Sequence, residues 1–338
     1  MPRCTSPRGS TPARLRLILA GAALLAVPLA GCTTATGGDG TAGDRPLIVV
    51  TTNVLGDVVS NIVGDSAEVM TLMPPNADPH SFQISAKEAA RINNADLLVS
   101  NGLGLEEGLS QHIDAAAADG IPSITAGELV DVLDYAAGES EGAVDPHLWT
   151  DPTRILAVVE GLTPLLQDAI SAHGTDDTTS DSAASDSAAS STNLIAGNAA
   201  AYSAELEQLD AEMDAAFAAI PAAGRNLVTN HHVFGYLADR YDFTVIGAVI
   251  PSGTTLAAPS ASDLASLVTA IEQAGVSTIF ADSSQPDRLV QVLADEAGID
   301  VAVVDLFTES LSAPGEGAET YLDMMRSNTE SIATGLSP

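Results

Sequence analysis

Six histidines are spread over the 338-residue chain, and four of them stand in segments typical of loops. The tripeptide Asp-Pro-His occurs twice, ending at His80 and at His147, and a pair, His231 and His232, stands in "TNHHVFGYL". Neutral imidazole is the commonest protein ligand of zinc and related ions, and a preceding proline restricts the backbone that presents it. These residue types indicate a metal site, although none of them has the short spacing of a zinc finger or an HExxH helix.

Taken one at a time, each of these histidines is more often a surface or hydrogen-bonded residue than a ligand. His112, in "EEGLSQHIDAA", is expected on the exposed face of an acidic helix, and His173 borders a low-complexity segment. We exclude both from the candidate site.

The elements that must position the histidines follow a regular pattern. Short apolar runs alternate with helical patterns, first in "LIVVTT", "AEVMTLM" and "ADLLVSNG", and later in "NLVTN", "TVIGAVI", "VSTIF" and "VAVVDLF". Such alternation is typical of βα units and a parallel sheet. We predict an α/β protein with two lobes of parallel-sheet βα units, joined by one long rigid helix, with ligands in the interlobe cleft at the carboxyl ends of the strands.

The predicted domain boundaries follow from composition and apolar spacing. Residues 46–195 form the first lobe, 196–220 the linking helix and 221–338 the second lobe, and within the first lobe the Ser/Asp-rich stretch 173–193 is expected to be disordered. Apolar residues of the linking helix recur at three- and four-residue spacing. They are Leu206, Leu209, Met213, Phe217 and Ile220.

The amino terminus has the pattern of an export signal. Residues 1–31 contain four arginines and then the apolar stretch "LILAGAALLAVPLA", which is shorter than a membrane span of about 20 residues. The stretch ends in "LAGC", which resembles a bacterial lipoprotein processing site with Cys32 as the lipid-bearing residue. Residues 32–45 are then a flexible tether. Cys4 is removed with the signal, so no disulfide is expected.

Charge and motifs exclude several classes of function. The net charge of −33 repels nucleic acid and weakly concentrates cations. The chain has no Walker-type glycine loop, so it is not expected to hydrolyse nucleotide.

Four stretches together resemble a known family: "NADPHSFQISAKEAARINNADLLVSNGLGLE", "DPHLWTDP", "HHVFGYLADRYDFTVIG" and "LFTESL". The chain is similar to the substrate-binding lipoproteins of bacterial zinc and manganese ABC importers (cluster 9, or cluster A-I), and within them to the zinc-binding, AztC-like or ZnuA-like members. The resemblance runs from about residue 46 to the C-terminus, apart from the low-complexity stretch.

The resemblance implies a ligand set, position by position. The first three ligands fall on His80, His147 and His231, and His232 is a neighbour. The fourth family ligand is usually an aspartate, and this chain has Glu309 there, in "FTESL". Asp282, in "FADSSQPDR", is the alternative for the acidic ligand.

The function implied is capture of Zn²⁺ outside the cytoplasmic membrane and its delivery to a membrane permease powered by a separate ATPase. The protein is expected to be a monomer anchored through Cys32 to the outer face of the cytoplasmic membrane, and no enzymatic activity is expected. Alternatives that stay open are Mn²⁺ as the cargo, a surface adhesin and a secreted zinc hydrolase. Either a zinc metallochaperone or the acidic loops would supply the metal.

Overall fold

The structure is a computed structural model that describes residues 45–136, 138, 140–173, 182–285, 288–297 and 301–337. All of them belong to one compact unit, Ala42–Pro338. The expected signal (residues 1–31), Cys32 and the tether up to residue 44 lie outside the described residues, so they stay predictions.

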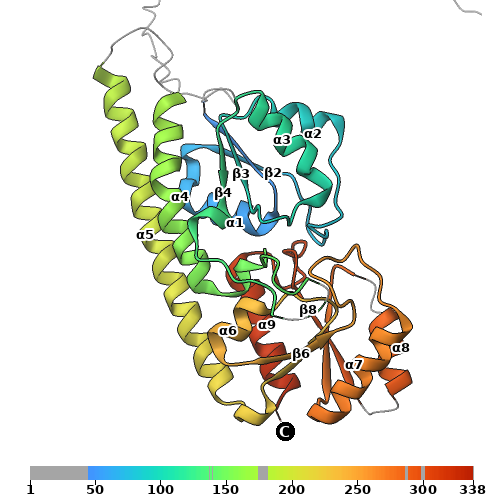
Figure 1. Cartoon of the computed structure of the whole chain (residues 1–338). Coiled ribbons are helices and arrows are strands. Elements are labelled where there is room, and N and C mark those ends of the chain that lie inside the picture. The colour runs from blue at the N-terminus through green and yellow to red at the C-terminus, as the bar shows by residue number, and fades with distance from the viewer. Residues whose placement is uncertain are drawn as a thin grey trace, which may run out of the picture. The chain divides into compact units, whose positions relative to one another are not determined.

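The first lobe is built on a four-stranded parallel sheet in the order β2-β1-β3-β4 (Figure 1). Its strands are β1 (Leu47–Val50), β2 (Glu68–Thr71), β3 (Leu97–Ser100) and β4 (Ser123–Thr125), and its helices are α1 (Asn53–Val63), α2 (Ala86–Ile92) and α3 (Ser110–Ala118). Alternate residues of β1 enter different hydrophobic clusters: Ile48 and Val50 pack with α1, whereas Val49 packs on the opposite face with Ile92 of α2. Burial on both faces explains why the strand is apolar throughout.

The second lobe repeats this arrangement with the sheet order β6-β5-β7-β8, again parallel. Its strands are β5 (Asn226–Thr229), β6 (Thr244–Ala248), β7 (Thr278–Asp282) and β8 (Ala302–Leu306), and its helices are α6 (Gly235–Tyr241), α7 (Ala261–Ala274), α8 (Arg288–Ala297) and α9 (Tyr321–Gly335). Helix α7 begins with a reciprocal capping box between Ser260 and Asp263 and ends at Gly275, whose positive φ of 63° suits glycine.

Short 3-10 turns complete the described part of the chain. They are η1 (Gly64–Ser66), η2 (Glu107–Leu109), η3 (Ala126–Leu129), η4 (Leu148–Thr150) and η5 (Ala222–Gly224).

Two long helices lie side by side along the lobes: α4 (Pro152–His173) and α5 (Ser182–Ala218). Helix α5 has 37 residues, which at 1.5 Å per residue is about 55 Å. It packs against α1 in the first lobe and α9 in the second. Helix α4 is long and apolar enough to cross a membrane by length and composition, but its buried face belongs to the same hydrophobic core as α5.

The linking helix differs from its predicted boundaries. It begins at Ser182 rather than at residue 196, and it ends at Ala218 rather than at residue 220. Residues 182–193, which were expected to be disordered, are therefore helical. His173 is the last residue of α4, and residues 174–181 lie outside the described residues. Alanine has the highest helix propensity, and α4 supplies a packing partner, with Gln167 Nε2 donating to the Thr192 carbonyl at 2.9 Å.

Candidate metal centre

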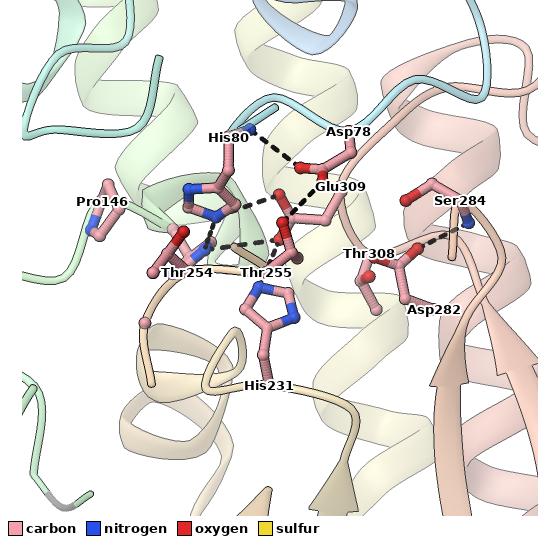
Figure 2. A network of polar contacts seen from close by, with 12 residues as sticks. Asp78, His80, Pro146, His231, Thr254, Thr255, Asp282, Ser284, Thr308 and Glu309 are labelled. Carbon is pink, nitrogen blue, oxygen red and sulfur yellow. Dashed lines mark hydrogen bonds and ion pairs between the residues drawn. The ribbon is translucent and has the colours of Figure 1, made fainter. Parts of the chain in front are cut away.

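The structure brings the four residues of the implied ligand set together between the lobes. Figure 2 shows three of them, His80, His231 and Glu309, pointing toward one another. His80 stands in the loop after β2, and His147 directly precedes η4. His231 follows β5 and Glu309 follows β8, both at carboxyl ends of strands of the second sheet. Carboxyl ends of parallel strands are where open α/β sheets place their ligands.

The donor atoms of this group all lie within 4.8 Å of one another. His80 Nε2 is 3.4 Å from His147 Nε2, and the Glu309 carboxylate is 3.8 Å from His80 Nε2, 3.4 Å from His147 Nε2 and 3.0 Å from His231 Nε2. A tetrahedral ion with bonds of about 2.1 Å requires donors about 3.4 Å apart. These four separations, from 3.0 to 3.8 Å, bracket the spacing that one tetrahedral ion needs.

Burial isolates these groups from solvent, since no member of the group is more than 1% exposed. Among the described residues, His231 Nε2 and both Glu309 oxygens have no hydrogen-bond partner. Unpaired buried polar atoms are unfavourable, so their convergence on one point needs an explanation. A cation bound between them would pair with His231 Nε2 and with the Glu309 carboxylate.

The two Asp-Pro-His tripeptides fold into the same local turn. The His80 amide donates to Asp78 Oδ1 at 2.9 Å, and the His147 amide donates to Asp145 Oδ1, also at 2.9 Å. Aspartate commonly accepts a hydrogen bond from the backbone two residues on. The aspartate side chain thus supports each histidine in addition to the restraint that proline imposes on the backbone.

Hydrogen bonds at Nδ1 orient two of the imidazole rings. His147 Nδ1 is 2.7 Å from Asp145 Oδ1 and 3.3 Å from the Tyr135 hydroxyl, and His231 Nδ1 is 3.2 Å from Asn230 Oδ1. Because the aspartate and asparagine oxygens can only accept, each ring carries its proton on Nδ1 and leaves the Nε2 lone pair for a metal. Among the described residues, His80 Nδ1 has no hydrogen-bond partner, and the half-exposed Glu107 carboxylate lies 3.7 Å from it.

Glu309 belongs to the second lobe but is held by residues of the first. The Trp149 indole N–H donates to the Thr308 carbonyl at 2.9 Å. On the other side of Glu309, the Leu311 amide donates to Asn53 Oδ1 at 2.9 Å, and Asn53 Nδ2 donates to Ser310 Oγ at 2.7 Å. These bonds fix the backbone that carries the carboxylate.

Burial changes the protonation equilibria of the group. It lowers the pKa of His80 to about 4 and that of His147 to about 3, against the opposing effect of the Glu309 charge. Burial also lowers the pKa of His231 and raises the pKa of Glu309. The imidazoles are therefore neutral at pH 7, which is the form that binds metal.

The other candidate residues lie outside the group of four. Asp282 is buried at the end of β7, its Oδ1 accepts the Ser284 amide at 2.8 Å, and burial raises its pKa to about 6. The His232 ring faces Gly138, where an added Cβ would lie 2.6 Å from Nε2. His112 is exposed on α3, and His173 pairs with Asp96 at 2.8 Å.

Sequence reasoning did not assign roles to the residues around the four. Asp145 was visible in the repeated tripeptide, which could have drawn attention to it. Tyr135 and Asn230 carry no motif of their own, and only their positions in the folded chain place them against His147 and His231.

Two parallel-sheet lobes with a donor group between them define a class of proteins that hold a small solute in an interlobe cleft. A family described as "ZnuA: Zinc-uptake complex component A periplasmic" matches residues 48–335. The chain therefore belongs to this family, whose members are substrate-binding proteins of metal ABC importers. The predicted family and the predicted two-lobed fold are both confirmed.

Individual relatives agree with this assignment. The "Zinc-binding protein TroA" of Treponema pallidum is 29% identical over 317 residues, which cover 91% of this chain and 94% of the relative. The "Manganese ABC transporter substrate-binding lipoprotein PsaA" of Streptococcus pneumoniae is 27% identical over 299 residues, covering 87% and 89%. The solved structure of the periplasmic zinc-binding protein TroA from Treponema pallidum matches with a TM-score of 0.73 and 28% identity, over 87% of this chain and 100% of that one.

Proposed function

We propose that this substrate-binding protein carries Zn²⁺, bound by His80, His147, His231 and Glu309. The observation that carries the proposal is the geometry of the four donors, which are buried and lie within 4.8 Å of one another. Glu309 is favoured over Asp282 as the acidic ligand because only Glu309 has its carboxylate within the group.

The donor types support zinc over manganese. Three imidazoles and one carboxylate suit zinc, whereas manganese prefers oxygen donors. Manganese is the second candidate because relatives of similar identity are named for each metal: TroA for zinc and PsaA for manganese.

Transport requires partners that this chain does not supply. In our proposal the loaded protein delivers its ion to the permease of an ABC importer, which a separate ATPase drives. PsaA is named as a lipoprotein, which supports an anchor at Cys32 on the outer face of the cytoplasmic membrane. A Cys32→Ala variant should then be released from membranes into the soluble fraction.

Titration of metal-stripped protein with Zn²⁺ and Mn²⁺ tests the proposed cargo. Calorimetry should give one site per chain with zinc bound more tightly than manganese. The single tryptophan, Trp149, reports binding independently because its ring centroid is 5.3 Å from that of His147. Zinc binding no tighter than micromolar would overturn the proposal and favour an adhesin, and tighter binding of manganese would reassign the cargo.

A hydrolase would need a coordination position left open for water. In the proposed site the Glu309 carboxylate occupies the fourth position, which argues against zinc-dependent hydrolysis. Zinc affinity that is independent of Glu309 would leave the fourth position open to water and favour a hydrolase.

A further inference from the structure

The carboxylate of Asp78 connects a proposed ligand to the opposite lobe. Its Oδ1 accepts the amide of His80 in the turn described above. Its Oδ2 accepts three hydrogen bonds, from Ser81 Oγ at 2.9 Å, Thr255 Oγ1 at 2.6 Å and Gln285 Nε2 at 2.9 Å. Thr255 and Gln285 belong to the second lobe, and Figure 2 shows Asp78 and Thr255 beside the site.

Asp145 occupies the same position in the second tripeptide but has a different set of contacts. Its Oδ1 holds both the amide and the ring of His147. The described hydrogen bonds of the Asp145 carboxylate all remain within its own tripeptide. Among the described residues, the first tripeptide alone joins its carboxylate to side chains of the other lobe by hydrogen bonds.

The segment that carries Thr255, residues 252–256, is also held by other first-lobe residues; we call it the cleft loop. The Gly253 amide donates to Ser140 Oγ at 3.1 Å, and the Tyr135 hydroxyl donates to the Gly253 carbonyl, also at 3.1 Å. A Cβ at position 253 would lie 2.1 Å from the Tyr135 hydroxyl, so only glycine permits this approach. The backbone of Gly253 and the side chain of Thr255 thus both attach the cleft loop to the first lobe.

We propose that Asp78 is a positioning residue that fastens the cleft loop over the metal site and thereby limits how fast the ion leaves. The proposal rests on the metal-binding function proposed above. Asp78 lies outside the donor group of four, so its effect passes through His80 on one side and Thr255 on the other. Hydrogen bonds to a carboxylate are stronger than neutral ones, which makes Asp78 the firmest of these fastenings.

The test measures metal dissociation into excess chelator by stopped flow for a double-mutant cycle of Asp78→Asn and Thr255→Val. Asparagine cannot hold the His80 amide and accept the three donors at once, and valine removes the hydroxyl without changing the shape. Residues around ligands commonly alter metal affinity by 10- to 100-fold. We expect Asp78→Asn to speed dissociation by about tenfold or more, Thr255→Val to speed it less, and the double variant to match Asp78→Asn.

Thr269→Val is the matched control, because the Thr269 hydroxyl is exposed and donates to the Ala265 carbonyl within α7, outside the cleft loop. It should dissociate at the wild-type rate. The proposal would be overturned if the dissociation rate of the double variant rose by the product of the two single increases. The two residues would then act separately.

Failure of the proposed function is detected separately, by a wild-type protein that binds neither zinc nor manganese. In that case amide hydrogen exchange of the metal-free protein still tests the fastening. Asp78→Asn should accelerate exchange in the cleft loop, whereas Thr269→Val should not. If amide exchange in the cleft loop were unchanged in Asp78→Asn, Asp78 would not hold this loop.

Discussion

At the scale of single residues, repetition of a tripeptide does not mean repetition of a role. Asp78 and Asp145 each hold the amide of the histidine two residues on, but Asp145 also orients its ring and Asp78 also contacts the opposite lobe. A proline restricts the backbone equally in both. The aspartate oxygens, rather than the proline, therefore distinguish the two loops.

The two acidic candidates should respond differently to removal of their charge. Glu309→Gln keeps the side-chain size but replaces a carboxylate by an amide, and we expect zinc affinity to fall by about a hundredfold or more because a charged ligand is lost. Asp282→Asn, at an equally buried position, should change affinity by less than about tenfold. Calorimetric titration of both variants checks this. A larger loss for Asp282→Asn would reverse the assignment.

Acidification should destabilise the metal-free protein through its buried imidazoles. Burial lowers the pKa of His147 from 6.5 to about 3, so between these values the unfolded chain binds a proton that the folded chain does not. Stability therefore falls as pH falls through this window. From pH 7 to pH 4, the free energy of unfolding of the wild type should fall relative to that of His147→Gln by roughly 1–3 kcal/mol.

Denaturant unfolding across this pH range measures the difference, which isolates His147 from the carboxylates that titrate nearby. His112→Gln, which removes an exposed imidazole from α3, is the control and should leave the wild-type curve nearly unchanged. If the difference in free energy of unfolding between wild type and His147→Gln did not change with pH, the lowered pKa of His147 would be contradicted.

The sequence could predict which histidines to consider but not what surrounds them. His80, His147 and His231 follow from loop positions and from the family pattern, and the structure places all three within one donor group. Tyr135 and Asn230 could not be predicted, because their contacts with the imidazoles exist only once the chain is folded. The lowered pKa values depend likewise on burial, which no local pattern encodes.

At the scale of elements, the strands with strong apolar runs could be predicted from the sequence. The predicted apolar runs coincide with β1, β2 and β3 in the first lobe and with all four strands of the second sheet. Strand β4 has only three residues, too few for a periodic signal. Helices α4 and α9 are not among the elements predicted from the sequence. The start of α5 differs from its prediction because serine and aspartate suggest disorder, whereas packing against α4 favours helix.

Helix α5 should lose much of its attachment to the second lobe without Phe217. The buried ring packs edge-on against Tyr241 at 5.1 Å and Phe243 at 5.0 Å between centroids. Phe217→Ala should lower the free energy of unfolding by about 3–5 kcal/mol, as a truncated core aromatic does. Asp214→Ala, exposed on the same helix, should change it by less than about 0.5 kcal/mol. Denaturant titration compares them, and equal losses would contradict this packing.

At the scale of the whole molecule, one hydrophobic cluster spans both lobes as a shared core, and each lobe also has a smaller cluster of its own. A single cluster of buried side chains contains Ile48 and Val58 of the first lobe, Leu206 of α5, and Phe280 and Met324 of the second. Lobes with separate cores commonly move as independent domains. Here a large opening movement would have to expose this shared core, so loops at the cleft are better placed to control exchange of the ion.

The shared core predicts one cooperative unfolding transition. Circular dichroism reports mainly the helices of both lobes, and Trp149 fluorescence reports the region around the site. The two denaturation curves of the metal-free protein should coincide. Zinc at about a hundred times its dissociation constant should then stabilise the protein by about 2.7 kcal/mol. Two separate midpoints would show that the lobes unfold independently.

The length of α5 also bears on how the protein can be made. A chain interrupted after the first sheet lacks the helix whose side chains Ile195, Ala199 and Tyr202 complete the core around that sheet. Its apolar face would be exposed to water, which favours aggregation and proteolysis over a stable half-molecule. An incomplete translation product would also lack the last strand, β8, and Glu309, the proposed acidic ligand that follows it.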